Sequence, residues 1–357
     1  MGLVDLSNVA VGESGRPPVL SAVDLSVERG ERFALLGASG AGKTLLLRVI
    51  AGLDEPLEGA ITVRGRSPRR ADPTVTMVFE EETVYDHLDV GGNLAFPLEI
   101  SGVGAGDRVR KTAQRFSIAG LLDRPARALS VGERRIVAAA RSLTHPGRSL
   151  LLLDDALVGM DNELRRRFLS AVMEDPDLTV LFASREPKEV MRWADRVAVI
   201  SGGRVAQIGD PVTVWRHPVS LDVAELIDEL DRIPGTVSGD LVEVGVSRLA
   251  MPLGVSLPDG ARVVVGVRPS HLSLAEPATP FHRRIAVTVG RVEPLGDRVR
   301  ALFGLGSQRG MAFVAELGAD ARVHPGDRVD LAVELETMGL YEPVSGLAIR
   351  SGSAGPR

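Results

Sequence analysis

The chain has 357 residues, which at roughly 100 to 200 residues per domain predicts two or three domains. Its net charge of −5 disfavours nucleic-acid binding through bulk electrostatics, and 25% charged residues are too few for a wholly disordered chain. The absence of cysteine excludes disulfides, thiolate nucleophiles and cysteine-ligated zinc. The chain also lacks a leader-like start and any run of about 18 apolar residues, so we expect it to be cytosolic.

The strongest motif lies near the N-terminus, where the apolar strand FALLG runs into the glycine-rich loop GASGAGKT and then into a helical pattern. Such a loop wraps phosphates with its backbone N–H groups, while its lysine reaches the β- and γ-phosphates and its Thr or Ser ligates Mg²⁺. A chance glycine turn is disfavoured by this strand, loop and helix context. The predicted nucleotide-binding residues are Gly37, Ala38, Ser39, Gly40, Ala41, Gly42, Lys43 and Thr44.

Further buried strands are predicted at 150–153, 179–184 and 197–200, alternating with helices. This alternation predicts an α/β fold with a parallel, doubly wound sheet. Asp154 ends the first of these strands, and we expect it to join Thr44 at the Mg²⁺ ion; a plain strand-end aspartate is the alternative. Between about 85 and 145 helical periodicity replaces the strand signals, which predicts a helical insertion.

The pattern changes near residue 235 to short alternating runs separated by Gly, Pro and Asp, which predicts a second, all-β barrel domain over 235–357. This segment has 13 basic and 13 acidic residues and four aromatics, so we expect no nucleic-acid binding there. Trp193 and Trp215 lie in apolar patterns and are predicted to serve packing.

The order of the motifs resembles the ATP-binding subunits of ABC importers of the maltose and polyamine type, which end in a TOBE barrel. The matching segments are MVFEEETVYDHLDV at the Q-loop, LSVGERRIVAAARSL at the signature, LLLLDDALVGMD at Walker B, FASREPKEVM at the switch position, and VGVRPSHLSL and MGLYEPVSGLAI in the barrel. The resemblance implies a RecA-like P-loop domain over residues 1–234, with a helical subdomain at about 85–145, and an OB-like, TOBE-type regulatory domain over 235–357.

The resemblance also implies a mechanism and partners. Two ATP-binding subunits, as a homodimer or a heterodimer, would close on two ATP molecules, each held by one P-loop and by the other chain's signature residues Ser130 and Gly132. Closure would drive transmembrane permease subunits at the cytoplasmic face of the membrane, served indirectly by a solute-binding protein. Tyr85 and the following NLAFPLEI resemble the carbohydrate-importing branch more than the polyamine or inorganic-anion branches. ATP and Mg²⁺ are the expected cofactors.

Five positions depart from the family pattern. Glu80 replaces the Q-loop glutamine, Asp155 the catalytic glutamate and Arg185 the switch histidine; the signature reads LSVGE, and the adenine-stacking aromatic near Ser14 is absent. Glu80 can still offer an oxygen to Mg²⁺. Asp155 is one methylene shorter than the usual base, and Arg185 is a permanent cation. We therefore expect a slow ATPase, with a non-catalytic or regulatory ATP-binding half as the alternative.

The altered signature retains a local structural purpose. Ser130 and Glu133 fit the capping box S-x-x-E, so we expect them to begin a helix. Glu133 nevertheless adds a negative charge where a partner's triphosphate would bind.

Overall fold

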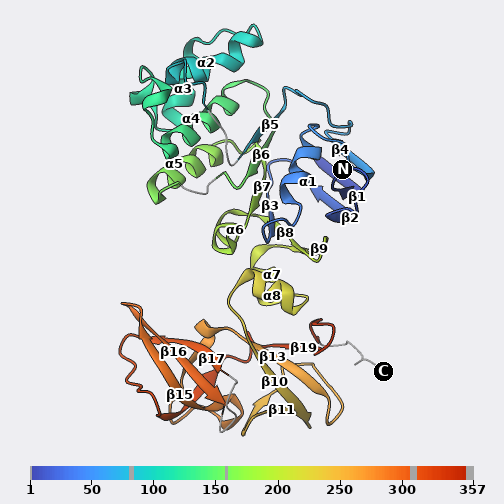
Figure 1. The fold of residues 1–357 in the computed structure, drawn as a ribbon, viewed down its shortest axis with the longest axis vertical. Coiled ribbons are helices and arrows are strands. Elements are labelled where there is room, and N and C mark those ends of the chain that lie inside the picture. The colour runs from blue at the N-terminus through green and yellow to red at the C-terminus, as the bar shows by residue number, and fades with distance from the viewer. Residues whose placement is uncertain (1, 80–83, 157–159, 306–311, 351–357) are drawn as a thin grey trace. The chain divides into compact units, whose positions relative to one another are not determined.

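The computed structural model describes residues 2–79, 84–156, 160–305 and 312–350 (Figure 1). The chain forms two compact units, Met1–Pro211 and Val212–Arg357. Within the described residues, no helix has both the length and the apolar character needed to cross a bilayer.

A six-stranded sheet forms the centre of the first unit, with the strand order β5-β6-β7-β3-β8-β9. All neighbours are parallel except β8 and β9, which are antiparallel. The continuous apolar run of β6 is buried at every position, as expected for a strand covered on both faces. The predicted α/β class is confirmed. The strands are β3 (Arg32–Gly37), β5 (Val75–Val78), β6 (Leu150–Asp154), β7 (Thr179–Ser184), β8 (Arg196–Ser201) and β9 (Arg204–Gly209).

A second, antiparallel sheet lies beside the first helix (Figure 1). It contains β1 (Val4–Val11), β2 (Leu20–Val27) and β4 (Glu58–Val63) in the order β2-β1-β4. Helix α1 (Lys43–Ile50) packs Leu46, Leu47 and Ile50 into a core shared with this sheet and with β3. The burial of α1 fixes the start of the helix, and with it the glycine-rich loop that precedes it.

Helices fill the stretch in which the sequence predicted an insertion. They are α2 (Val90–Ile100), α3 (Gly106–Arg115) and α4 (Val131–Thr144), with short 3₁₀ turns at Ala119–Leu121 and Ala126–Ala128. Phe116, after α3, packs edge-on against Phe168 of α5 (Asn162–Met173), with ring centroids 6.2 Å apart. The last helix of the unit is α6 (Pro187–Trp193).

The second unit is built mainly from two five-stranded sheets around one apolar core, which confirms the predicted β-rich barrel. All strand pairs in it are antiparallel. One sheet has the order β12-β11-β10-β13-β19 and contains β10 (Asp231–Ser238), β11 (Leu241–Val244), β12 (Ser247–Ala250), β13 (Arg262–Val267) and β19 (Gly339–Tyr341). The other has the order β14-β18-β15-β16-β17 and contains β14 (Leu272–Leu274), β15 (Arg284–Pro294), β16 (Arg298–Leu305), β17 (Ala312–Gly318) and β18 (Arg328–Val333).

Two short helices precede these sheets, α7 (Pro211–Arg216) and α8 (Leu221–Ile227). Leu221 and Ala224 of α8 pack against the buried ring of Tyr341 in β19. Strand β10 begins at Asp231, opposite Val267 of β13, so residue 235 lies within a strand. The second compact unit begins at Val212. The predicted boundary between the nucleotide-binding domain and the barrel domain, at residues 234 and 235, stays a prediction.

Candidate nucleotide-binding site

The predicted site residues follow neighbouring strands on one edge of the six-stranded sheet. In a parallel sheet the C-terminal ends of the strands share an edge, where ligands bind in open α/β folds. Register pairs Leu36 of β3 with Ser184 of β7, and Ala183 of β7 with Asp154 of β6. The glycine-rich loop, the two aspartates and Arg185 therefore all leave the sheet at this edge.

Two glycines give the loop its shape. Gly40 has a φ of 77° and Gly42 a φ of 93°, in the left-handed region that glycine adopts without steric cost. Gly42 is also the N-cap residue of α1, so the chain turns from the loop directly into the helix. Helix N-termini favour anions because their first N–H groups have no partner within the helix.

Lys43 lies beneath this loop, with only 5% of its surface exposed. Its Nζ donates hydrogen bonds to the carbonyl oxygens of Gly37 at 2.7 Å and Ala38 at 2.9 Å. Burial lowers the pKa of Lys43, and the negative charge of Asp155 opposes that shift. These two hydrogen bonds hold the Lys43 side chain at the loop.

Thr44 and Asp154 form the second feature of the site. The Thr44 hydroxyl donates a hydrogen bond of 2.9 Å to Oδ1 of Asp154, which is itself buried. A hydroxyl and a carboxylate held side by side are oxygen ligands of the type that Mg²⁺ prefers. The structure therefore brings together two of the three predicted metal ligands.

The third predicted ligand, Glu80, lies outside the described residues. Ser14 lies between β1 and β2, where no aromatic residue occurs in the sequence from Asn8 to Val19.

Asp155 and Arg185 contact each other. The Arg185 Nε lies 3.2 Å from Oδ2 of Asp155, whose side chain is 12% exposed. The other carboxylate oxygen, Oδ1, is buried and accepts no hydrogen bond within the described part of the chain. Asp155 also has a φ of 45°, a left-handed conformation that aspartate tolerates better than most residues. A buried oxygen in need of a partner fits a position that faces a water or a phosphate.

Sequence reasoning missed Glu189 of α6. Its Oε2 accepts a 2.7 Å hydrogen bond from the hydroxyl of Ser184, the residue before Arg185. Burial raises the pKa of Glu189, the Ser184 bond opposes the shift, and the charge of Asp155 adds to it. The available signal was an acid four residues after Arg185, in the first turn of the helix that follows it. Glu189 fixes Ser184 and thereby the backbone that carries Arg185.

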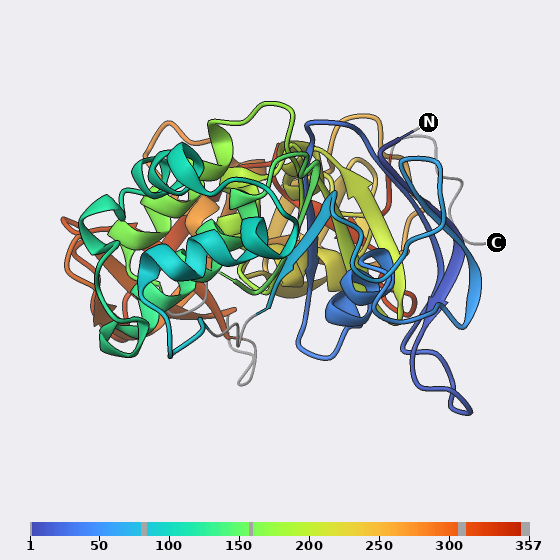
Figure 2. The ribbon, with the colours of Figure 1, turned by 90° about the horizontal axis from the view of Figure 1, so that it is seen from above.

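The signature residues begin α4. Ser130 and Glu133 form the predicted capping box: the Ser130 hydroxyl accepts from Glu133 N at 3.3 Å, and Oε2 of Glu133 accepts from Ser130 N at 2.8 Å. Val131 is 67% exposed, whereas Gly132 is buried against Leu164 of α5. Figures 1 and 2 place α4 among α2, α3 and α5, on the far side of β5 and β6 from α1. The loop at α1 and the signature helix are therefore separate surfaces of one chain.

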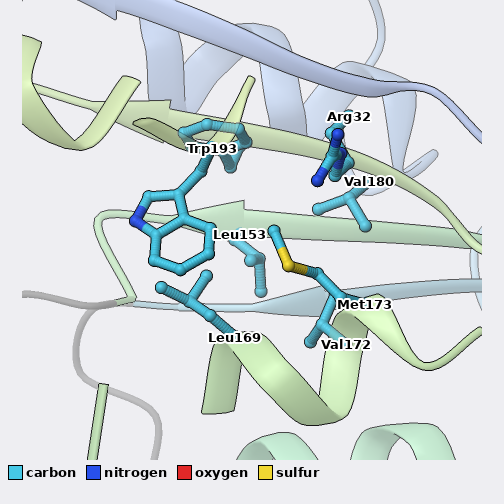
Figure 3. A pocket seen from close by; sticks show the side chains of 8 residues that line it. Arg32, Leu153, Leu169, Val172, Met173, Val180 and Trp193 are labelled. Carbon is cyan, nitrogen blue, oxygen red and sulfur yellow. The ribbon is translucent and has the colours of Figure 1, made fainter. Parts of the chain in front are cut away.

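A small, mostly apolar cleft lies beside α5 and α6 and is also lined by residues of β3, β6 and β7. Figure 3 shows the indole of Trp193 facing Leu169 and Met173 across it, with Arg32 at one end. Its volume is about 30 Å³, far below the roughly 300 to 1,000 Å³ of ligand pockets. Trp193 therefore has the packing environment that its apolar sequence context predicted.

Known protein families match both units. A family model described as ABC transporter matches residues 20–158, and one described as TOBE domain matches residues 265–338. The sn-glycerol-3-phosphate import ATP-binding protein UgpC 1 of Rhizobium johnstonii is 32% identical over 353 residues, covering 94% of each chain. The chain belongs to the ABC transporter family. Membership confirms the predicted resemblance and makes this ABC protein a nucleotide-binding protein.

Other relatives match most of the chain. The spermidine/putrescine import ATP-binding protein PotA of Rubrobacter xylanophilus is 34% identical, covering 87% of this ABC protein and 86% of the relative. The glucose import ATP-binding protein GlcV of Saccharolobus solfataricus is also 34% identical, covering 80% and 83%. An ABC transporter component from Clostridium perfringens has a similar fold, with a TM-score of 0.56 at 22% identity over 60% of this chain and 91% of that chain.

Proposed function

We propose that this chain is the ATP-binding subunit of an ABC import complex and couples ATP binding and hydrolysis to the uptake of a small polar solute. The observation that carries the proposal is the convergence of Lys43, the Thr44 and Asp154 pair, and Asp155 on one sheet edge. A cation, an oxygen pair for a metal and a carboxylate with an unused oxygen are the groups that phosphoryl transfer requires.

Each group has a separate task. Lys43 and the loop N–H groups bind the phosphates. Thr44 and Asp154 would hold Mg²⁺, which neutralises charge on the phosphates when bound. Asp155 would accept a proton from the attacking water through Oδ1, the oxygen that Arg185 leaves unpaired. Glu80 would add a further oxygen ligand, and Arg185 would contact the terminal phosphate.

The proposed partners follow from the relatives and from the two separate surfaces of the domain. The relatives are named for import of sn-glycerol-3-phosphate, spermidine or putrescine, and glucose. We propose an organic solute of this size, probed first with carbohydrates. Ser130 and Gly132 would bind the ATP held by a second ATP-binding subunit, and the pair would act on permease subunits at the cytoplasmic face of the membrane, supplied by a solute-binding protein.

A second candidate function is a nucleotide-binding half that turns over little ATP and pairs with an active homologue. The Arg185 and Asp155 ion pair favours it, because a permanent cation occupies one oxygen of the proposed base and cannot relay a proton as histidine does. Glu133 in the signature also favours this function, because its negative charge would oppose binding of the triphosphate held by the partner.

Steady-state turnover of the purified chain separates the two functions. The protein is incubated with MgATP, phosphate release is followed, and the bound nucleotide is then identified by chromatography. Steady release that Lys43→Ala abolishes supports the transport ATPase. Stable ATP occupancy without ADP supports the passive half, and the absence of any Mg²⁺-dependent nucleotide binding contradicts both.

A further inference from the structure

The second unit contains a cleft that the nucleotide chemistry does not use. Its volume is about 560 Å³, within the roughly 300 to 1,000 Å³ range of ligand pockets. It is lined by the segment before α8, the end of β12, the start of the turn after β13, and β19. One wall is apolar and includes Met251 and Met338, which we call the methionine wall.

An arginine lies buried at this cleft. Arg268 is 2% exposed and donates one hydrogen bond, from Nη2 to the carbonyl oxygen of Trp215 at 2.7 Å. Its guanidinium carbon lies 4.2 Å from the centre of the Trp215 ring. Asp228 approaches Nε only to 3.6 Å, and Nε makes no hydrogen bond within the described residues. A guanidinium has five N–H donors, so this buried cation retains unused capacity for an anion.

The other charges lining the cleft are mostly positive. Arg216, Arg283 and Arg350 line it with Arg268, against one carboxylate among the described lining residues, Glu336. Glu336 is already paired with Arg283 at 3.2 Å. Asp228 offsets part of the charge of Arg268, and an excess of about two positive charges remains. The charge of the described lining residues therefore favours an anion over a cation.

Two of these arginines, Arg268 and Arg350, line the cleft together with the buried Tyr341. The ring of Tyr341 is 2% exposed, and burial raises the pKa of its hydroxyl. Arg350 donates a hydrogen bond of 2.7 Å from Nη2 to the carbonyl oxygen of His217, another lining residue. An anion seated beside Tyr341 would have two guanidinium groups within reach, and Arg side chains pair with carboxylates and phosphates through parallel hydrogen bonds.

We propose that this cleft binds a small organic anion, whose carboxylate or phosphate pairs with Arg268 and Arg350 while its apolar body lies along the methionine wall. The site would give the second unit a ligand of its own, independent of the nucleotide. Because the anion would relieve the unsatisfied charge of a buried arginine, its binding stabilises the second unit.

The cleft carries its own spectroscopic reporter, because Trp215 lies against Arg268. In the full chain with Trp193→Phe, Trp215 is the remaining tryptophan. Its fluorescence is titrated with benzoate, phenyl phosphate and inorganic phosphate. We expect saturable changes with one or both of the aromatic anions and binding at least about ten-fold weaker for inorganic phosphate, which has no apolar body.

Variants test the assignment of residues. Arg350→Ala should weaken binding about ten-fold or more, since hydrogen bonds to charged groups contribute about that much. Arg322→Ala, which removes an exposed arginine of the same unit outside the cleft, should leave the affinity unchanged. Lys43→Ala should also bind the aromatic anions normally, which separates this site from the nucleotide site.

Arg268→Met should abolish binding, and circular dichroism shows whether that variant folds; if it does not fold, Arg350→Ala decides. Three outcomes would overturn the proposal: no saturable response to either aromatic anion, equal affinity for inorganic phosphate, or unchanged affinity in Arg350→Ala.

Discussion

The Nε atom of Arg185 lies 3.2 Å from Oδ2 of Asp155, so the residues at the switch and base positions neutralise each other. A terminal phosphate would offer Arg185 a competing anion, and Asp155 would then change its contacts as ATP binds. ATP binding would thereby control the exposure of Asp155, the proposed general base.

The first prediction concerns turnover. Asp155→Glu combined with Arg185→His should raise kcat at least about ten-fold at saturating ATP, because a positioned general base contributes about 10²- to 10⁴-fold. Phosphate release measures the rate, and Arg185→His alone separates the effect of the residue at position 185 from that of the longer carboxylate at position 155. Vigorous turnover by the natural chain that the double replacement does not improve would show that the aspartate and arginine already form a competent site.

The second prediction concerns nucleotide affinity. Lys43→Ala should weaken binding of a fluorescent ATP analogue by about ten-fold or more, because a charged donor at the phosphates is lost. Lys188→Ala, which changes an exposed lysine of the same unit, is the matched control. GTP should compete almost as well as ATP, since no aromatic residue near Ser14 selects the base. Equal binding by Lys43→Ala and the natural chain would refute the assignment of Lys43 to the phosphates of ATP.

The third prediction separates the two properties of Glu133. Glu133→Gln should preserve stability within about 0.5 kcal/mol, because glutamine also completes a capping box. The same change should strengthen ATP-dependent self-association, measured by sedimentation, since a negative charge near the partner's phosphates is removed. Glu133→Ala should instead lose about 1 kcal/mol of stability. Unchanged association in Glu133→Gln would mean that its charge lies outside the dimer contact.

The fourth prediction concerns pH. Burial raises the pKa of Asp231 from 3.8 to about 6, opposed by the hydrogen bond from Val314 N at 2.8 Å. The folded state therefore holds this proton more tightly than the unfolded state. Its stabilising contribution is complete below about pH 4 and is lost as the pH rises through about 6.

Asp231→Asn should remove that loss, making the variant more stable than the natural chain at pH 8 by about 1 kcal/mol, a value discounted for partial exposure to solvent. Thermal unfolding from pH 4 to 8 measures the difference. Asp320→Asn, which changes an exposed aspartate, is the control. If the natural chain and both variants lose stability in parallel as the pH rises, the pH dependence does not come from Asp231.

The fifth prediction concerns the division of the chain. Residues 1–211 alone, and residues 1–234, should both bind ATP within about three-fold of the full chain, because all the described P-loop and strand-end contacts lie before residue 211. The longer fragment should aggregate more readily, since it keeps Leu221 and Ala224 of α8 without the Tyr341 ring that covers them. If the fragments fold but bind no nucleotide, the second unit must contribute to the nucleotide-binding site.

Local sequence patterns were sufficient for the parts of the site that depend on strand ends. Gly37, Asp154 and Arg185 are recognisable because each follows an apolar run, and parallel strands bring such ends to one edge. The capping box of α4 was equally visible because its two partners are three residues apart. The class of fold and the family could therefore be inferred from the sequence.

Contacts between distant residues were not accessible in the same way. Arg268 and Trp215 are 53 residues apart, and nothing in either neighbourhood marks the tryptophan as the surface beneath a buried cation. The packing of α8 against Tyr341 likewise joins segments more than a hundred residues apart, and no local pattern indicates it. Tertiary packing, not local pattern, determines such features.

The left-handed backbone of Asp155 determines which replacements can be interpreted cleanly. Asparagine tolerates this conformation and nearly matches the shape of aspartate, so Asp155→Asn removes the charge with little other change. Alanine and glutamate must each be held at a positive φ that costs about 1 to 2 kcal/mol for ordinary L-residues. A loss of activity in Asp155→Ala would therefore mix chemistry with backbone relaxation, and any gain from Asp155→Glu would understate the benefit of the longer side chain.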